Sequence, residues 1–562
     1  MIPNFRNLPI ICTFPITPTP LATHCQLPVS LMNGQQHQQP LETVLAQMAL
    51  RLRGFVMKVG MPDGVYDGEE DDNDNYNVDD GDEVEERTLW RRVRTLVEFG
   101  LAADVRLVQW LSEMNQRLLD GGGPSRAKVI KTIADRLQWV ALRLSLRSLP
   151  PICSPRIHRI QSLDKCSSPD TSSIAFQSEA EVTARMDIAG GWTDTPPITY
   201  QCASPPAVLN LSIKVNGKRP IRCRCARLEA FGGVFYTQTS NGNTERTLHF
   251  ASANSVFACC AQPSKLGSLI SSILIVAGIV REELIGGERI RQFAMTGPGR
   301  GLYVSANSDL PHGSGLGTSS ILSGAMLAAL WRLFGKSFQQ SELIHAVLRV
   351  EQLHTTGGGW QDQIGGCAPG GFKLGTVCPG GKRECQWRAV PIGNSLQNEM
   401  SKRLALIYTG QTRLAKHLLE EVLLSWLGRD QRILRAVQRL SDGARGAEKA
   451  LLEGKFPSDI CREYNALKKE FTAGTMPSKV AELSRELTAE GLAEAAWMAG
   501  AGGGGFLYVW LREHRTLEEL ECFLAGDKRW HGMGVWRAEM EVAEPMTLRR
   551  GWTLPVNEFN RL

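Results

Sequence analysis

The chain has 562 residues, of which 43% are hydrophobic and 22% are charged. This usage excludes a wholly disordered or fibrous protein, and the length leaves ample chain for three or four domains. The 63 basic and 58 acidic residues give a net charge of +5, and without the twelve carboxylates of Asp67–Glu86 the rest of the chain carries about +17. This dispersed excess suits anionic small substrates as well as nucleic acid, so it does not choose between them.

The first 175 residues carry no obvious chemistry. Residues 1–87 join a Pro-, Thr- and Gln-rich start to the acidic run, and we expect a disordered region that ends in a solvated linker. Apolar residues then recur at helical spacing over 88–150, with a break at Gly121–Pro124, which predicts a helical hairpin. Residues 151–175 are rich in Ser and Pro and are expected to form a linker.

Cysteines and apolar runs bear on the cell compartment. None of the 14 cysteines belongs to a Cys-x-x-Cys pair, so we expect reduced thiols in a cytoplasmic protein. The most apolar run, Leu266–Val280, is shorter than the ~20 residues of a membrane span and predicts a buried helix. We expect no membrane partner. Basic stripes interleaved with aromatic residues are also missing, so nucleic acid is not expected, and the oligomeric state stays open.

From Ala175 onward, short β-like runs interleave with helix-like runs without a regular β-α-β rhythm. This pattern favours an α+β fold over a doubly wound parallel sheet. Asn216-Gly217, between two apolar runs, predicts a β-hairpin. The expected strands are Glu181–Ile188, Ala207–Val215, Arg219–Leu228, Gly233–Thr239 and Phe506–Trp510, and the expected helices are Ser264–Val280, Thr318–Phe334, Gln340–Leu353 and most of 417–495.

A glycine-rich run precedes one of these helices and carries the strongest chemical signal. It reads Pro311-His312-Gly313-Ser314-Gly315-Leu316-Gly317-Thr318-Ser319-Ser320. Small residues allow close backbone approach to a ligand, and amides at a helix N-terminus attract phosphate. The three hydroxyls could cap the helix, bind phosphate or ligate Mg²⁺. The purely structural alternative is a glycine-rich turn with serine caps. The run is not a Walker motif, because no Gly-Lys-Ser/Thr follows the glycines.

Two carboxylates form the second signal. Asp362 lies on a loop between two glycine runs, where it could take a proton from a hydroxyl nucleophile. Glu351 lies eleven residues upstream, near the end of a predicted helix, and could hold Mg²⁺ while Asp362 meets the substrate. Taken as isolated acids, both carboxylates fit a surface or capping role better than a catalytic one.

The third signal is a strand that runs into a polar glycine turn. Arg185 and Asp187 stand within the apolar run and need partners if they are buried. Asp194 could accept hydrogen bonds from sugar hydroxyls, and Trp192 could stack on a sugar face or pack in the core. Later in the chain, the glycine run Gly500–Gly505 permits close backbone approach.

Together these four motifs resemble, in order and spacing, the GHMP kinase superfamily. The resemblance covers about residues 176–512, and within the superfamily the chain is similar to the L-fucose kinases, on the strings Asp187–Pro197, Gly357–Gln363 and Tyr408–Ala415. Galactokinases carry a different first motif. The resemblance implies a domain over 176–395 like the second domain of ribosomal protein S5, which binds ATP and sugar, and a ferredoxin-like domain over 396–562.

The resemblance also implies roles for single residues. Asp362 matches the catalytic aspartate and Arg185 the arginine that pairs with it. Substrate contacts are implied for Asp194, Gly191, Trp192 and Gly359. Glu351 and a hydroxyl of Thr318 or Ser319 match the Mg²⁺ ligands. The implied ATP and phosphate contacts are Pro311, Gly313, Ser314, Gly315, Leu316, Gly317, Thr318, Ser319, Ser320, Gly502, Gly503 and Gly504.

The implied reaction is transfer of the γ-phosphate of ATP to the anomeric hydroxyl of L-fucose, giving β-L-fucose 1-phosphate for GDP-fucose salvage. The L-fucose kinases of animals carry a long nucleotidyltransferase-like part before the kinase half. This chain lacks that part, so we expect a fragment, an isoform or an uncertain gene model.

Other readings stay open at this point. D-arabinose shares the ring stereochemistry of L-fucose. A heptose-phosphate kinase would need an extra basic cluster, to which Arg413 and Lys416 could contribute. A catalytically silent sugar sensor or scaffold on the same fold is the non-enzyme alternative, and retention of Asp362, Arg185 and Glu351 argues against it.

Overall fold

The computed structural model describes residues 177–550, with gaps at 203, 229–231, 241–242, 263–264, 286–287, 295–300, 355–357, 379–383 and 412–414. The expected disordered region, helical hairpin and linker over 1–87, 88–150 and 151–175 lie outside the described residues. The chain forms two compact units, and nearly all described residues belong to the one built from the described parts of Pro150–Glu420 and Arg435–Leu562. The description below concerns that unit, except that the bounds of two helices include parts of Glu421–Leu434.

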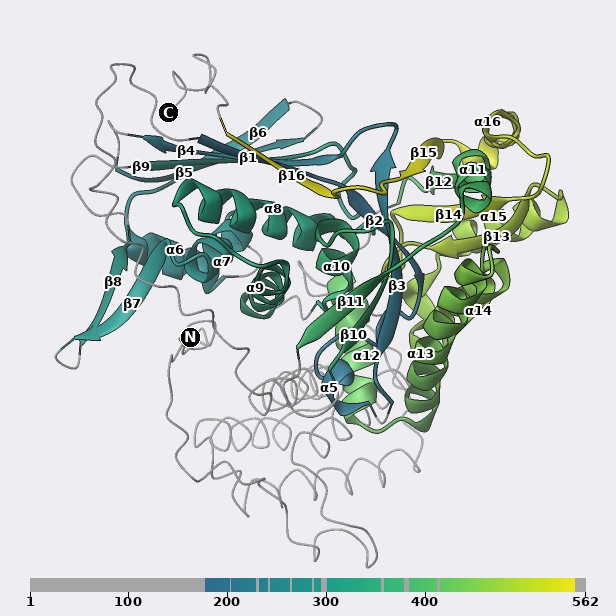
Figure 1. Cartoon of the computed structure of the whole chain (residues 1–562), viewed down its shortest axis with the longest axis horizontal. Helices are drawn as coiled ribbons and strands as arrows, with labels where there is room; N and C mark the ends of the chain where they lie inside the picture. Colours follow the sequence, from purple (N-terminus) through teal and green to yellow (C-terminus); the bar gives the residue numbers. More distant parts are fainter. Residues whose placement is uncertain are drawn as a thin grey trace, which may run out of the picture. The chain divides into compact units, whose positions relative to one another are not determined.

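Six strands form the first sheet (Figure 1). They are β1 (Gln177–Val182), β4 (Ile221–Leu228), β5 (Gly233–Ser240), β6 (Asn243–Phe250), β9 (Gly301–Ser308) and β16 (Met546–Arg550). Their spatial order is β16-β1-β4-β9-β5-β6, and among these neighbours β5 and β9 alone run parallel. In β4, Cys223 and Cys225 are buried while Arg222 and Arg224 pair with glutamates of β1, which is the two-residue alternation of a half-buried strand.

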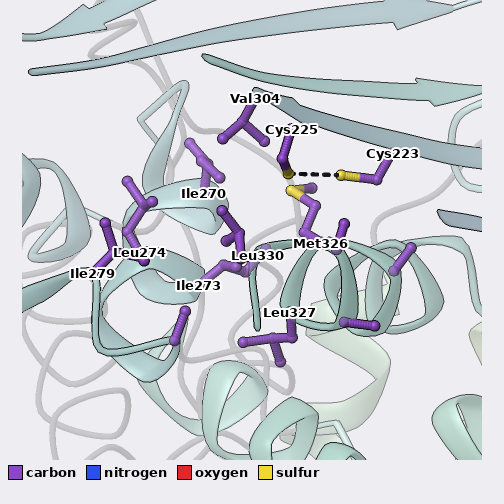
Figure 2. Packing of buried hydrophobic residues seen from close by; sticks show 14 of the residues in the cluster. Cys223, Cys225, Ile270, Ile273, Leu274, Ile279, Val304, Met326, Leu327 and Leu330 are labelled. Atoms are coloured by element: carbon purple, nitrogen blue, oxygen red, sulfur yellow. Dashed lines mark hydrogen bonds between the residues drawn. The ribbon is translucent and has the colours of Figure 1, made fainter. Parts of the chain in front are cut away.

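Helices cover the apolar face of this sheet. They are α6 (Ala253–Cys260), α7 (Ser268–Val276), α8 (Thr318–Leu333) and α9 (Gln340–Leu353), and a small ribbon of β7 (Val280–Ile285) and β8 (Glu288–Phe293) follows α7. Figure 2 shows Cys223, Cys225 and Val304 of the sheet facing Ile273 of α7 and Met326 of α8. The two thiols lie 3.9 Å apart within this apolar layer. Because buried residues of α8, β1 and β4 belong to one apolar cluster, α8 packs against these two strands.

Eight strands form the second sheet. They are β2 (Ala184–Ala189), β3 (Ala207–Val215), β10 (Phe372–Val377), β11 (Cys385–Val390), β12 (Leu404–Tyr408), β13 (Ala493–Met498), β14 (Phe506–Leu511) and β15 (Gly534–Met540). The order is β11-β10-β3-β15-β12-β14-β13, with β2 paired to β3. This sheet takes strands from both sides of residue 395, where the sequence predicts a domain boundary.

The remaining described helices are α5 (Ile198–Gln201), α10 (Gln361–Cys367), α11 (Asn394–Arg403), α12 (Ala415–Leu427), α13 (Gln431–Leu452), α14 (Ser458–Phe471), α15 (Ser478–Ala489) and α16 (Leu517–Gly526), with short 3₁₀ turns at Ala473–Thr475 and Lys528–Trp530. α15 and α16 bury Leu483, Leu487 and Leu520 against the strands β12 to β14. The predicted α+β class is confirmed. No helix in the described part of the chain is long and apolar enough to cross a membrane.

The hairpin predicted at Asn216-Gly217 is wrong beyond its turn. Both residues have positive φ, and Val215 and Lys218 exchange backbone hydrogen bonds across them. The strands then part, because β3 belongs to the second sheet and β4 to the first. Pro220 precedes β4 and has no N–H to donate, so the ladder cannot continue past the turn.

Candidate active site

The predicted phosphate loop leads directly into α8. Gly313, Gly315 and Gly317 all have positive φ, the backbone region where glycine is favoured, and Gly317 stands at the N-cap. The Ser314 and Thr318 hydroxyls lie 2.9 Å apart, and Ser314 also accepts from the Leu316 N–H. The first amides of a helix have no intrahelical partners, so this end of α8 offers donors to an anion.

The glycine turn 500–505 packs on the other side of that loop. Phe506 donates its N–H to the Ser314 carbonyl at 3.0 Å. A Cβ on Gly500 would lie 2.8 Å from the Gly315 carbonyl, a separation that a side chain does not tolerate. Gly502 and Gly503, for which ligand contacts are predicted, lie close to the backbone of Thr475. The turn therefore supports the phosphate loop from behind.

Arg185 and Asp362 meet as predicted, although 177 positions separate them. Asp362 lies in the first turn of α10, and its Oδ1 accepts from Arg185 Nε and Nη2, both at 2.7 Å. Arg185 is 2% exposed, whereas Asp362 is 23% exposed and so is reachable by a ligand. Burial alone would lower the pKa of Arg185, but the charges of Asp362 and Asp187 outweigh burial and raise it well above its ordinary value.

Arg185 also reaches the phosphate loop. Its Nη1 donates to the Gly315 carbonyl at 2.9 Å and to Asp187 at 2.7 Å. Gly317 packs against Asp362 and Arg185, because a Cβ there would lie 3.0 Å from the Asp362 Cγ and 3.2 Å from the Arg185 Cγ. The ion pair and the helix N-terminus thus share one small volume.

Glu351, near the end of α9, is brought to the same place. It is 4% exposed, and its Oε1 accepts from the Ser320 hydroxyl at 2.7 Å. The same hydroxyl lies 3.4 Å from Asp362 Oδ2. The sequence suggests Thr318 or Ser319 as the metal-binding hydroxyl. In the structure Thr318 lies against Ser314, Ser319 is exposed, and Ser320 is the hydroxyl that contacts both carboxylates.

A group of buried oxygen acceptors surrounds the start of α10. Asp194 Oδ2 accepts from the Gln361 N–H at 3.0 Å, and Asn210 Nδ2 donates to the Gln361 carbonyl at 3.2 Å. The other side-chain oxygens of these three residues, Asp194 Oδ1, Asn210 Oδ1 and Gln361 Oε1, are buried and have no hydrogen-bond partner in the described part of the chain. Burial raises the pKa of Asp194 to about 7. Such orphaned acceptors call for donors from a ligand.

Two glycines make this gathering possible. A side chain on Gly359 would collide with Asp194, and one on Gly191 would collide with Tyr464 and Gln361. Trp192, predicted as a substrate contact, is 5% exposed and stacks on Phe471 with ring centroids 5.9 Å apart. The geometry favours the core-packing alternative for Trp192.

Sequence reasoning missed several residues of this site. Asn210 lies inside β3, where a polar side chain amid Ala, Val, Leu and Ile was the available signal. Gln361 adjoins Asp362 and could have been noticed for that reason. The buried Lys468 and Tyr464 of α14 carry no local signal. Gly357 and Arg413, which the motif analysis singles out, lie outside the described residues.

Comparisons with known proteins agree with this geometry. Residues 283–370 match the family model "GHMP kinases N terminal domain", which includes the phosphate loop and Asp362. The bifunctional fucokinase/GDP-fucose pyrophosphorylase of Arabidopsis thaliana is 30% identical over 379 residues, 65% of this chain and 33% of that protein. The L-fucokinase/L-fucose-1-P guanylyltransferase of Bacteroides fragilis is 31% identical over 338 residues, 58% of this chain and 33% of that protein.

The solved structures that align with this chain are more distant in sequence. A D-glycero-D-manno-heptose 1-phosphate kinase from Bacteroides thetaiotaomicron aligns with a TM-score of 0.46 at 16% identity, covering 67% of this chain and 100% of that one. Galactokinase from Lactococcus lactis aligns with a TM-score of 0.44 at 13% identity, covering 66% and 95%. The chain spans about a third of the length of its two curated relatives. Residues 283–370 are therefore similar to the N-terminal domain of GHMP kinases.

Proposed function

We propose that this chain transfers the γ-phosphoryl group of ATP to the anomeric hydroxyl of L-fucose, giving β-L-fucose 1-phosphate and ADP. The observation that carries the proposal is the Arg185–Asp362 ion pair. It lies between a glycine-rich helix N-terminus and a group of buried acceptors that have no partner among the described residues. Both curated relatives have fucokinase in their names, which supports L-fucose as the sugar.

The acceptor group supports a polyhydroxylated substrate. A sugar presents hydroxyl donors around its ring, and Asp194 Oδ1, Asn210 Oδ1 and Gln361 Oε1 have no donor among the described residues. A site whose buried polar groups are satisfied only by the substrate rejects analogues that lack the matching hydroxyl, because those groups are then left unpaired. The same acceptors would bind D-arabinose, which has the ring stereochemistry of L-fucose.

The oxygen donors present fit a Mg²⁺ ion. Glu351, Ser320 and Asp362 gather carboxylate and hydroxyl oxygens at the N-terminal end of α8. In kinases Mg²⁺ takes one or two carboxylates together with substrate phosphates. Glu351 and Ser320 would hold the ion, and Asp362 lies next to it. A Mg²⁺ ion there would neutralise part of the charge of the triphosphate.

The chain's own residues accept a proton, orient the base and bind the phosphate oxygens. Asp362 accepts the proton of the sugar O1 hydroxyl while O1 forms its bond to the γ-phosphorus, and the bond from that phosphorus to the bridging oxygen breaks, so that ADP leaves. Arg185 orients Asp362 through two hydrogen bonds to its Oδ1. The amides of the phosphate loop donate to the phosphate oxygens.

The first prediction tests substrate and base together. The full chain is incubated with Mg-ATP and, separately, L-fucose, D-arabinose, D-galactose or a heptose 7-phosphate, and ADP release is measured. We expect L-fucose to be turned over best, and the variant Asp362→Asn to lose about 10²–10⁴-fold in kcat, because a positioned base contributes that much. Asp442→Asn, an exposed aspartate of α13, is the matched control and should keep wild-type activity.

Each other outcome has a definite meaning. Preference for the heptose phosphate would contradict the proposed substrate and favour the heptose-phosphate kinase alternative. Full activity of Asp362→Asn would contradict the assigned base. Folded protein that binds ATP but turns over none of these sugars would contradict the proposed activity of this chain and favour a sensor or scaffold.

A further inference from the structure

Asp187 is a buried carboxylate that the reaction described above does not use. It is 0% exposed, yet five groups donate to it. Oδ1 accepts from Arg185 Nη1 at 2.7 Å, from the Gly500 N–H at 2.9 Å and from the Tyr508 hydroxyl at 3.0 Å. Oδ2 accepts from the Tyr464 hydroxyl at 2.7 Å and from Lys468 Nζ at 2.9 Å. These donors come from β2, α14, the 500–505 turn and β14.

Lys468 is the counterpart of this carboxylate. It is 0% exposed, and its Nζ also donates to the Met498 carbonyl at 2.8 Å and lies 4.0 Å from the centre of the Tyr464 ring. Burial alone would raise the pKa of Asp187, but the charge of Lys468, followed by that of Arg185, lowers it well below its ordinary value. Lys468 and Arg185 together therefore favour the ionised form of Asp187.

The cluster holds equal numbers of cationic and anionic side chains. Arg185 and Lys468 are two cations, and Asp187 and Asp362 are two carboxylates. Arg185 divides its donors, because Nη1 faces Asp187 and Gly315 whereas Nε and Nη2 face Asp362. Without the Lys468 charge, Arg185 would be the only cation that balances both carboxylates in this cluster. The buried, less solvated Asp187 would then compete with Asp362 for the hydrogen-bond donors of Arg185.

We propose that Asp187 and Lys468 are a positioning pair: the ammonium of Lys468 neutralises Asp187, and Asp187 then holds Arg185 in the orientation that presents Asp362 to the sugar. The inference rests on the proposed kinase function for its kinetic consequence only. Because Lys468 and Gly500 come from the second half of the chain, the pair also ties that half to β2 and to the phosphate loop.

The test compares single and charge-balanced variants in the full chain. Lys468→Met removes one cation and is expected to lower kcat at least tenfold, with the KM values for ATP and sugar changed less than threefold. Adding Asp187→Asn to Lys468→Met restores the balance of one cation and one carboxylate. We expect this double variant to recover at least threefold in kcat over Lys468→Met alone. Lys469→Met, the same change at the exposed neighbouring position, is the matched control.

A structural role without positioning gives a different result. In that case the double variant would be no more active than Lys468→Met, or Lys468→Met would be fully active while folded, and either outcome overturns the proposal. Melting temperatures test the pair without turnover. The double variant should melt at a higher temperature than Lys468→Met alone, because it leaves no unpaired buried carboxylate, and a lower melting temperature would contradict the pairing. If the wild type turns over no sugar, the proposed function fails, whereas the melting order still decides on the pair.

Discussion

At the scale of single residues, Asp194 is held at a cost to stability. It is 2% exposed, one of its oxygens has no partner in the described part of the chain, and burial raises its pKa to about 7 from an ordinary value of 3.8. The unfolded chain releases this proton near pH 4, whereas the folded chain keeps it until about pH 7. The folded state therefore binds more protons between these values, and its stability declines as pH rises through that window.

The substitution Asp194→Asn separates stability from substrate binding. A neutral amide carries no such penalty, so the variant's gain in melting temperature over the wild type should be small at pH 4, grow up to pH 7 and stay constant above it. At pH 8, where Asp194 is ionised, the KM for sugar should rise about tenfold, because a hydrogen bond to a charged acceptor is lost. Thermal unfolding at pH 4.5, 6 and 8 measures the first effect, with exposed Asp459→Asn as control. A gain that is independent of pH would contradict the assignment.

The residues of the site could be predicted from the sequence only where a motif marked them. Asp362, Arg185 and Glu351 stand in recognisable strings, and the structure brings all three together. The choice of hydroxyl needed three dimensions, because Thr318, Ser319 and Ser320 are consecutive and the turn of the helix decides which of them faces inward. Lys468 does not belong to any motif, and its partner Asp187 lies 281 positions away, so the sequence alone does not predict this pair.

At the scale of elements, α10 is a short helix that carries Asp362 and depends on outside contacts. Its seven residues are too few for a helix that is stable alone. Lys373 of β10 is 0% exposed and donates to the Gly365 and Ala368 carbonyls at 2.7 and 2.8 Å, and to the Ser212 hydroxyl of β3. A cation at the C-terminal end of a helix is favourable, although burial lowers the pKa of Lys373 to about 7.

Loss of this lysine should loosen α10 more than the rest of the unit. In Lys373→Met, two carbonyls at the end of α10 lose their donor, so amide hydrogen exchange over Gln361–Ala368 should become at least tenfold faster. Exchange in α9, which does not contact Lys373 through any of these bonds, is the internal reference. Unchanged exchange in α10 would show that the helix is held by other contacts.

Elements were predictable where their own pattern determines them. β3 and α9 have the predicted bounds, because an apolar strand between turn residues and a helix with period 3.6 are local signals. The run Glu181–Ile188 splits at Thr183 into β1 and β2, which join different sheets, and Val280 opens β7 instead of ending a helix. Pairing with strands that are distant in the sequence determines where such elements end, and a single sequence does not identify these pairing partners.

At the scale of the whole unit, the site is assembled where distant parts of the chain meet. Arg185 comes from the second sheet, Glu351 and the phosphate loop belong to the helices beneath the first, and the 500–505 turn joins β13 to β14 (Figure 1). The fold class follows from the mixture of elements, but the predicted boundary at residue 395 stays a prediction, since one sheet takes strands from both sides of it.

The position of the new phosphate tests the central claim most directly. The full chain is incubated with Mg-ATP and L-fucose labelled with ¹³C at C1, and the C1 resonance is followed by NMR. We predict that the signals of both anomers of the free sugar give way to one β-anomer signal that is split by coupling to phosphorus. Persistence of the free-sugar signals with folded, ATP-binding protein, or a phosphate coupled to any other carbon, would contradict the account.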